Sequence, residues 1–213
     1  MRGEEIYVKH PRDSYIRTGG LHLTYFKITQ EEYVKCLEVQ AIDKSDMDPH
    51  EEMVVSMKAD EHKIKAIIFA ALCVEAAIND YAGVHFGDTY SEKHLQSLDV
   101  ISKWVLIPKL ACGRSIDKSG PSFSALTQLI RSRNKLVHNK SKEFNPRDPN
   151  WAEKSFKAEV SFNNDFENSL RSLYLLSMEM DFVLGQLHNP IRTLDKKFNV
   201  FLEIPRQVEP LFN

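Results

Sequence analysis

Cysteine is scarce in this sequence of 213 residues, and its three copies, Cys36, Cys73 and Cys112, lie far apart. No CxxC pair occurs, and no cysteine lies at zinc-finger spacing from a histidine. An odd number of isolated cysteines argues against a disulfide framework of the kind that stabilises small secreted domains. We therefore expect reduced thiols and a cytoplasmic location.

The patterns of known metal and phosphate sites are lacking as well. His62, His85 and His94 have acidic neighbours, but none of them belongs to an HxxxH or HExxH pair. The loop at 113–120 contains two glycines and Lys118 without the order GxxxxGK[ST]. We expect no metal site and no cofactor.

Neither sign of charge is in excess. Lys and Arg total 28 and Asp and Glu total 30, which gives a net charge of −2. This balance excludes a protein that coats nucleic acid by bulk charge. A local basic patch is nevertheless present, because residues 131–142 contain five lysines and arginines and no acid.

Long hydrophobic runs are also missing. The longest apolar stretch, residues 64–77, is interrupted by Lys65 and Glu75, which makes it too short and too charged to cross a bilayer. The first residues lack the apolar segment of a signal peptide. We expect no membrane partner. Apolar residues still make up 42% of the chain, too many for a disordered protein.

What the sequence does contain is helical periodicity after a short β-like start. Residues 15–28 read as two short strands around the Gly19-Gly20 turn, which predicts an N-terminal β-hairpin over 1–28. Thr29 and Glu32 form a capping box that predicts a helix over 30–43. Asp48-Pro49 with Glu51 predicts the start of a long helix over 49–82.

The remaining residues predict further helices joined by polar segments. Pro108 is expected to stop one of them, and a polar connection is expected over 139–163. The expected helices are 91–106, 121–138 and 164–187. The fold class is thus mainly α: a bundle of four to five helices over 29–189, with an irregular tail over 190–213 that holds a short strand near 199–204.

Two charged residues lie where apolar ones are expected. Arg133 falls in the middle of the apolar face of helix 121–138, and Glu75 falls in the middle of the apolar face of helix 49–82. Buried charges are costly unless they are paired, so we infer that Glu75 approaches Arg133. Such a pair can be purely structural, and this interpretation stays open at this point.

The sequence around Arg133 resembles a known motif. Arg133-Asn-Lys-Leu-Val-His138 is similar to the R-x4–6-H motif of the HEPN superfamily, in which a polar residue such as Asn134 follows the arginine. The stretch 70–81, with Glu75 and Asn79, is similar to the preceding long helix of that family. The resemblance covers residues 49–187. Arg17 and His22 have the same spacing but enclose a Gly-Gly turn, so we regard that copy as chance.

The resemblance implies a HEPN-like helical bundle with a metal-independent endoribonuclease activity. RNA would be cut by attack of the ribose 2′-OH, which leaves a 2′,3′-cyclic phosphate. It implies a homodimer with a composite active site, and a toxin or anti-phage effector with a possible antitoxin or regulatory partner. The implied residues are Arg133, Asn134 and His138 as catalytic, Glu75 and Asn79 as supporting, and Arg131, Lys135 and Lys140 as RNA-binding. The alternative is a non-catalytic HEPN-like module for dimerisation or binding.

Overall fold

The computed structural model describes residues 19–139, 148–195, 197 and 204–208, and the regular secondary structure within these ranges is helical. The prediction of a mainly α fold is confirmed. The elements are α1 (His22–Gln40), α2 (Pro49–Phe86), α3 (Asp88–His94), α4 (Val100–Cys112), α5 (Pro121–Val137), α6 (Trp151–Leu184) and a 3₁₀ turn η1 (Gln186–His188).

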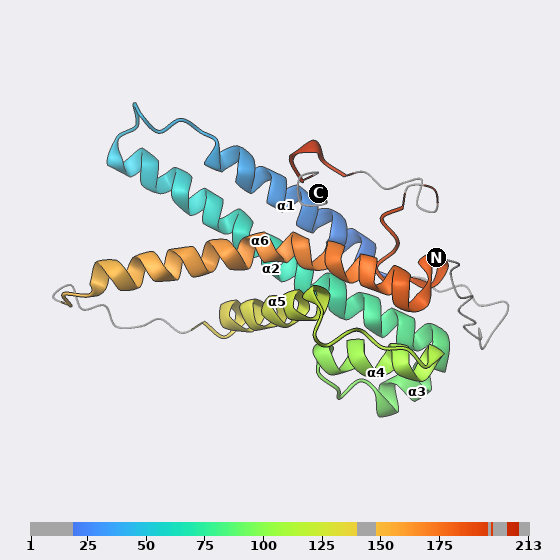
Figure 1. The fold of residues 1–213 in the computed structure, drawn as a ribbon. Helices are drawn as coiled ribbons and strands as arrows, with labels where there is room; N and C mark the ends of the chain where they lie inside the picture. The colour runs from blue at the N-terminus through green and yellow to red at the C-terminus, as the bar shows by residue number, and fades with distance from the viewer. Residues whose placement is uncertain (1–18, 140–147, 196, 198–203, 209–213) are drawn as a thin grey trace.

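Helix α2 is the central element, and α1, α3, α4, α5 and α6 all pack against it (Figure 1). It starts as predicted: Asp48 accepts from the backbone N–H of Glu51, and the Glu51 side chain accepts from the N–H of Asp48. Small and apolar residues such as Ala66, Ala70 and Val74 are completely buried, which lets the neighbouring helices approach closely. By length and composition alone α2 could cross a membrane. However, 56% of its most apolar 18-residue segment is buried inside this fold, as in the core helix of a bundle.

Helix α6 crosses the pair formed by α1 and α2 and completes the core (Figure 1). Leu170 and Leu173 are fully buried. The ring of Tyr33 on α1 stacks on Phe166, with 4.3 Å between centroids, and Gln30 donates to the Tyr174 hydroxyl at 3.1 Å. These contacts join segments far apart in the sequence, so α1 is an integral part of the bundle.

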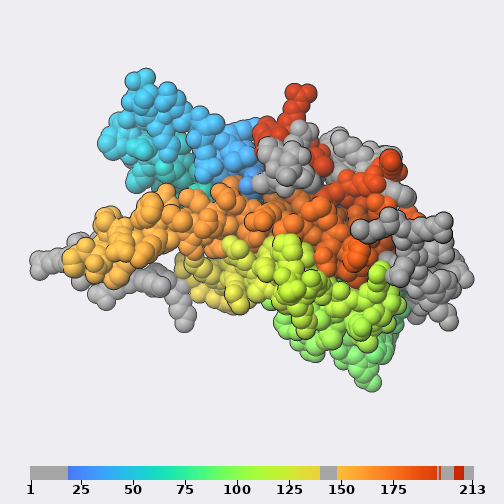
Figure 2. All heavy atoms as spheres, in the orientation of Figure 1, coloured from blue at the N-terminus to red at the C-terminus, as the bar shows by residue number. Residues whose placement is uncertain are grey.

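The first turns of two helices extend beyond this core. Residues 151–161 of α6 are exposed on every side, and so are most of residues 49–58 of α2. In Figure 2 the light-orange start of α6 and the cyan start of α2 diverge from each other at one end of the molecule. We call these two segments the α6 arm and the α2 arm.

The predicted second strand of the N-terminal hairpin is wrong, because residues 22–28 form the first turns of α1. The alternation around Leu21 also fits a helix whose buried face includes Phe26 and Thr29, and packing against α2 decides between the two. Thr29 does not cap a helix; its hydroxyl donates to the Tyr25 carbonyl one turn earlier at 2.8 Å. The first predicted strand lies outside the described residues.

Three other predicted boundaries are wrong. The expected helix 91–106 is two helices, because Asp99 caps a new one by accepting from the N–H of Ser102 at 3.0 Å. Pro108 does not stop α4, which continues to Cys112 and ends at Gly113 in the left-handed region (φ 78°). Helix α6 begins at Trp151, inside the expected polar connection. The strand expected near 199–204 lies mostly outside the described residues.

Candidate functional site where α4 and α5 meet α2

The predicted contact between Arg133 and Glu75 is present. Arg133 Nη2 lies 3.3 Å from Glu75 Oε2, and Nη1 donates to the side-chain oxygen of Asn134 at 3.0 Å. The two charged side chains are 29% and 34% exposed, so the pair lies at the rim of the α2–α5 contact. Two partners thus orient the guanidinium, and within the described residues its remaining N–H donors are unused.

The helical register of α5 explains this position. Leu126 and Leu129 are completely buried, and Arg133 follows them along the same side of the helix. Gly120 and Pro121 start the helix, which fixes its phase relative to α2. The arginine therefore reaches Glu75 at the point where the apolar contact ends and solvent begins.

Asn79 lies one turn after Glu75 but has a different partner. Its side-chain oxygen accepts from Lys103 Nζ at 2.9 Å, and Lys103 on α4 is only 4% exposed. The structure therefore places Asn79 with Lys103 and not with Arg133. Lys103 was not predicted as a site residue, although a lysine inside the apolar segment 100–107 is the same anomaly that identified Arg133.

His138 is the residue that ends α5. It is exposed, and its backbone N–H donates to the Asn134 carbonyl at 3.0 Å. Arg133 and His138 are five residues apart, which corresponds to about 140° around a helix axis. The two side chains therefore point to different sides of α5 within one chain. Asn134 lies between them, and its side-chain oxygen is directed to Arg133.

The predicted RNA-binding residues Arg131 and Lys135 lie on another side of α5. Both line an open groove of about 480 Å³ between α5 and α6, together with Gln128 and Asp165. Lys135 Nζ is 3.8 Å from a carboxylate oxygen of Asp165, whereas Arg131 is exposed. The groove is polar and contains charges of both signs. Lys140 lies outside the described residues.

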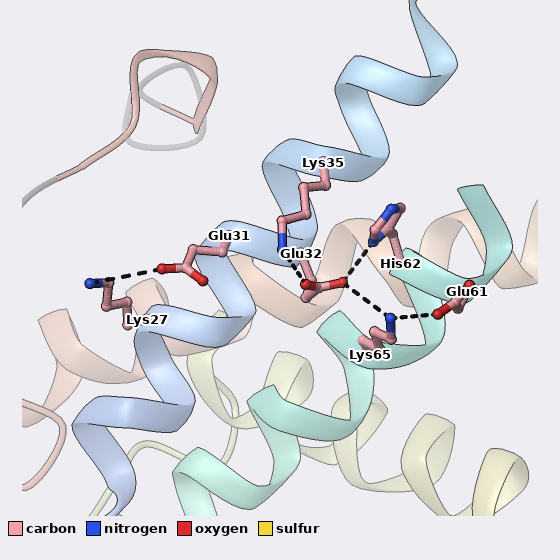
Figure 3. Close-up of polar contacts among 7 residues, drawn as sticks. All are labelled: Lys27, Glu31, Glu32, Lys35, Glu61, His62 and Lys65. Carbon is pink, nitrogen blue, oxygen red and sulfur yellow. Dashed lines mark hydrogen bonds and ion pairs between the residues drawn. The ribbon is translucent and has the colours of Figure 1, made fainter. Parts of the chain in front are cut away.

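A second charged cluster lies between α1 and α2 (Figure 3). Glu32 is almost buried and accepts from Lys35 at 2.7 Å, and its other oxygen lies 2.7 Å from His62 Nδ1. Lys65 lies 4.0 Å from the same carboxylate. Burial by itself raises the pKa of Glu32, but the hydrogen bonds from Lys35 and His62 outweigh it and hold the pKa below its ordinary value.

The described residues form no metal-ion site, and the thiols of Cys36 and Cys73 are buried away from solvent. Within the described residues, no group of three or more His, Cys, Asp or Glu side chains is arranged to hold a metal ion. Cys73 is buried, its thiol donates to the His22 carbonyl at 3.2 Å, and burial raises its pKa. Burial also raises the pKa of Cys36 to about 11, so both groups are protonated thiols at neutral pH.

Comparison with known proteins adds no relative: no family model, no curated protein and no solved structure matches this chain. The functional argument therefore depends on the geometry around Arg133, Glu75 and His138.

Proposed function

We propose that this chain is a metal-independent endoribonuclease of the HEPN type. The observation that carries the proposal is the state of Arg133: two partners hold its guanidinium, and it still presents N–H donors to solvent. The same helix ends at an exposed imidazole, His138. A planar cationic fork and an imidazole are the groups that metal-free phosphodiester cleavage needs.

The chemistry is a transfer within the RNA backbone. The ribose 2′-oxygen attacks the adjacent phosphorus, the O2′–P bond forms and the P–O5′ bond breaks. One His138 takes the proton from the 2′-OH, and a second His138 gives a proton to the departing 5′-oxygen. Arg133 stabilises the negative charge that develops on the phosphorane oxygens. The products are a 2′,3′-cyclic phosphate and a 5′-hydroxyl.

A homodimer supplies the second histidine. The angle of about 140° between Arg133 and His138 prevents both side chains of one chain from facing the same phosphate directly. Two copies of α5 that face each other across a two-fold axis can bring two arginines and two histidines to one cleft. Arg131, Lys135 and Lys140 attract the RNA backbone towards that cleft. We place the enzyme in the cytoplasm as a toxin or anti-phage effector, controlled by an antitoxin or regulatory protein.

The test compares cleavage of a fluorescent RNA by purified variants in the presence of EDTA. We expect His138→Ala to reduce the rate by about 10²–10⁴-fold and Arg133→Ala by about 10²–10³-fold. His50→Ala and Arg171→Ala remove an exposed histidine and an exposed arginine elsewhere, and they should cleave as the wild type does. Thermal melting should change little, because Arg133 and Glu75 are both partly exposed.

Three outcomes of this assay contradict the proposal: cleavage by purified His138→Ala at the wild-type rate, products that end in 2′- and 3′-hydroxyls, and complete loss of activity in EDTA. If Arg133→Ala unfolds, Arg133→Lys keeps the ion pair with Glu75 but not the fork, and it should fold and still lose most of the activity.

The second candidate function is a non-catalytic binding module. The observation in its favour is the apolar surface of the two arms, where Met57 is 64% and Phe156 is 66% exposed. Wild-type protein that forms a stable dimer in sedimentation experiments but cleaves none of a panel of RNAs would favour this function.

A further inference from the structure

One side of α2 carries an apolar stripe that no described element covers. Its four large apolar side chains lie within about 100° around the helix axis, and each is between 42% and 64% exposed: Met53, Val54, Met57 and Ile64. A stripe of this width is typical of a helix that buries one face against a neighbour. This α2 stripe begins in the α2 arm, the cyan end of α2 in Figure 2.

The chain itself covers the same side of α2 farther along the helix. Glu75 follows Met57 by about five turns, so the two side chains share one side of α2. There α5 lies against the helix, and its Arg133 is 3.3 Å from the Glu75 carboxylate. The α2 stripe therefore has the pattern of a covered helix face without a neighbour among the described residues. Its length from Met53 to Ile64 is about 17 Å, which matches about three turns of a partner helix.

Methionine is concentrated at this end of α2. Three of the six methionines in the sequence lie at positions 47, 53 and 57. The unbranched thioether side chain adapts to the shape of whatever packs on it, and surfaces that bind helical segments use it for this reason. Met53 and Met57 are both more than half exposed, so they are accessible to such a segment.

The segment that carries most of the α2 stripe is acidic. Residues 42–58 contain five acids and two lysines, which gives a net charge of −3, compared with −2 for the whole chain. Asp43, Asp48 and Glu51 accept from backbone N–H groups of their own segment. No described lysine or arginine forms an ion pair with any of the five acids. The segment therefore presents a negative surface beside the apolar side chains.

The charge of this segment selects among the occupants that an apolar stripe can take. Two copies of the chain that met through their stripes would bring a charge of −3 against a charge of −3. An anionic membrane surface would be repelled in the same way. A partner with lysines or arginines beside its apolar face is attracted instead, and the same charges reject acidic partners.

We propose that the α2 stripe binds an amphipathic helix of another protein, whose apolar face is flanked by lysines or arginines. The apolar face of that helix packs on Met53, Met57 and Ile64, and its cations face the acids of residues 42–58. This interaction goes beyond RNA cleavage and uses none of the residues proposed for it. The two proposals can therefore fail separately.

The experiment is a fluorescence anisotropy titration of labelled peptides with the full wild-type chain. The probe is a synthetic helix of leucine and lysine that has all its leucines on one face. One control peptide has the same composition with the leucines spread around the helix, and another has glutamate in place of lysine. We expect the probe to bind at least about tenfold more tightly than either control peptide.

Variants of the chain test the two parts of the surface. Met57→Ser should weaken binding of the probe at least about fivefold, whereas Met178→Ser, which changes an exposed methionine of α6, should not weaken it. Asp46→Asn combined with Glu52→Gln should weaken binding at least about threefold at low salt. Glu38→Gln combined with Glu92→Gln removes two exposed acids elsewhere and is the charge-matched control. All these side chains are exposed, so the variants should melt as the wild type does.

Several outcomes overturn the proposal. Equal binding of the probe and its rearranged control would mean that charge alone attracts the peptide, and equal binding of the glutamate control would remove the argument for a cationic partner. Unchanged binding by Met57→Ser overturns it as well, and so does undetectable binding of the probe at about 0.1 mM chain. A wild-type chain that sediments as a dimer, with Met57→Ser as a monomer, would show instead that a second copy covers the α2 stripe.

Discussion

Lys103 is the residue whose environment is most unusual for its charge. It is 4% exposed, and within the described residues its ammonium has a single partner, the neutral side chain of Asn79. A buried ammonium without a counter-ion contributes little net stability, whereas the same ammonium without any partner is costly. The two members of this pair should therefore respond very differently to substitution.

We expect Lys103→Met to leave the free energy of unfolding within about 1 kcal/mol of wild type, because an unbranched apolar chain fills the same space and Asn79 stays solvated. Asn79→Ala should cost about 1–3 kcal/mol, because it leaves the buried ammonium unpaired. Urea denaturation monitored by circular dichroism measures both values. A larger loss for Lys103→Met than for Asn79→Ala would show that the lysine contributes through contacts other than this hydrogen bond.

Glu75 is a positioning residue for Arg133 under the proposed function. Glu75→Gln should lower kcat for RNA cleavage roughly tenfold with little change in KM, because the guanidinium loses its ionic partner and its fixed orientation. The cost in stability should stay below about 1 kcal/mol, since solvent screens this partly exposed pair. Glu38→Gln, at an exposed position on α1, is the matched control. A structural role alone would lower the melting temperature and leave kcat per folded molecule unchanged.

The Arg133–Glu75 contact could be predicted from the sequence because two opposite charges interrupted two apolar stripes that had to be buried. The Asn79–Lys103 contact was missed, although Lys103 also interrupts an apolar segment, because the helix that carries it was predicted with the wrong start and end. The cavity of about 360 Å³ that is lined by His22, Tyr81 and Arg192 could not be predicted for another reason. Its residues come from three distant segments, and the first of them was predicted as a strand.

At the scale of elements, the contact of α1 with α2 contains a buried acid. The pKa of Glu32 lies below its ordinary value of 4.5, so the carboxylate adds stability that is fully present above pH 4.5 and is lost as the pH falls through the lowered native value. We expect Glu32→Gln to be less stable than wild type at pH 7 by about 1–3 kcal/mol. The difference should shrink below pH 4.5, as wild-type Glu32 also becomes protonated.

The measurement for Glu32 is a set of urea titrations between pH 3 and 7 for both proteins. Glu31→Gln changes the neighbouring acid, which is half exposed and, among the described residues, is ion-paired only with the exposed Lys27, so it should show no such pH-dependent difference (Figure 3). A gap between Glu32→Gln and wild type that is constant with pH would mean that Glu32 acts through packing and not through charge.

The helices that were predicted well are those with both a start signal and a single apolar face. Asp48-Pro49 and Gly120-Pro121 each mark a true start, since α2 and α5 begin there. The start of α6 was missed because residues 151–161 are exposed on all sides and so show no apolar stripe. The start of α1 was missed because the Gly19-Gly20 pair also suits a hairpin turn.

At the scale of the whole molecule, stability should be very uneven along the two longest helices. The α6 arm and the α2 arm have no buried residues over 151–161 and 49–58, whereas residues 166–184 and 66–82 form the core. We expect amides in the arms to exchange with deuterium at least on the order of 10²-fold faster than amides in those core segments. Hydrogen exchange with mass spectrometry measures this directly. Equal protection of arm and core in dilute protein would show that the arms are covered in solution, as they would be in a dimer formed through them.

Helix α2 carries the proposed ribonuclease residues and part of a cavity lining in a fixed angular relation. Glu75 and Asn79 project towards α5 and α4, while Asp80 and Tyr81 line the cavity on another side. Each added residue turns the following side chains by about 100°. A single insertion or deletion between residues 75 and 85 would therefore turn one of these two sets of side chains out of phase with the other. Before Ala59, the first buried residue of α2, the helix can gain or lose residues freely. We therefore expect insertions and deletions in this helix to be tolerated only in its arm.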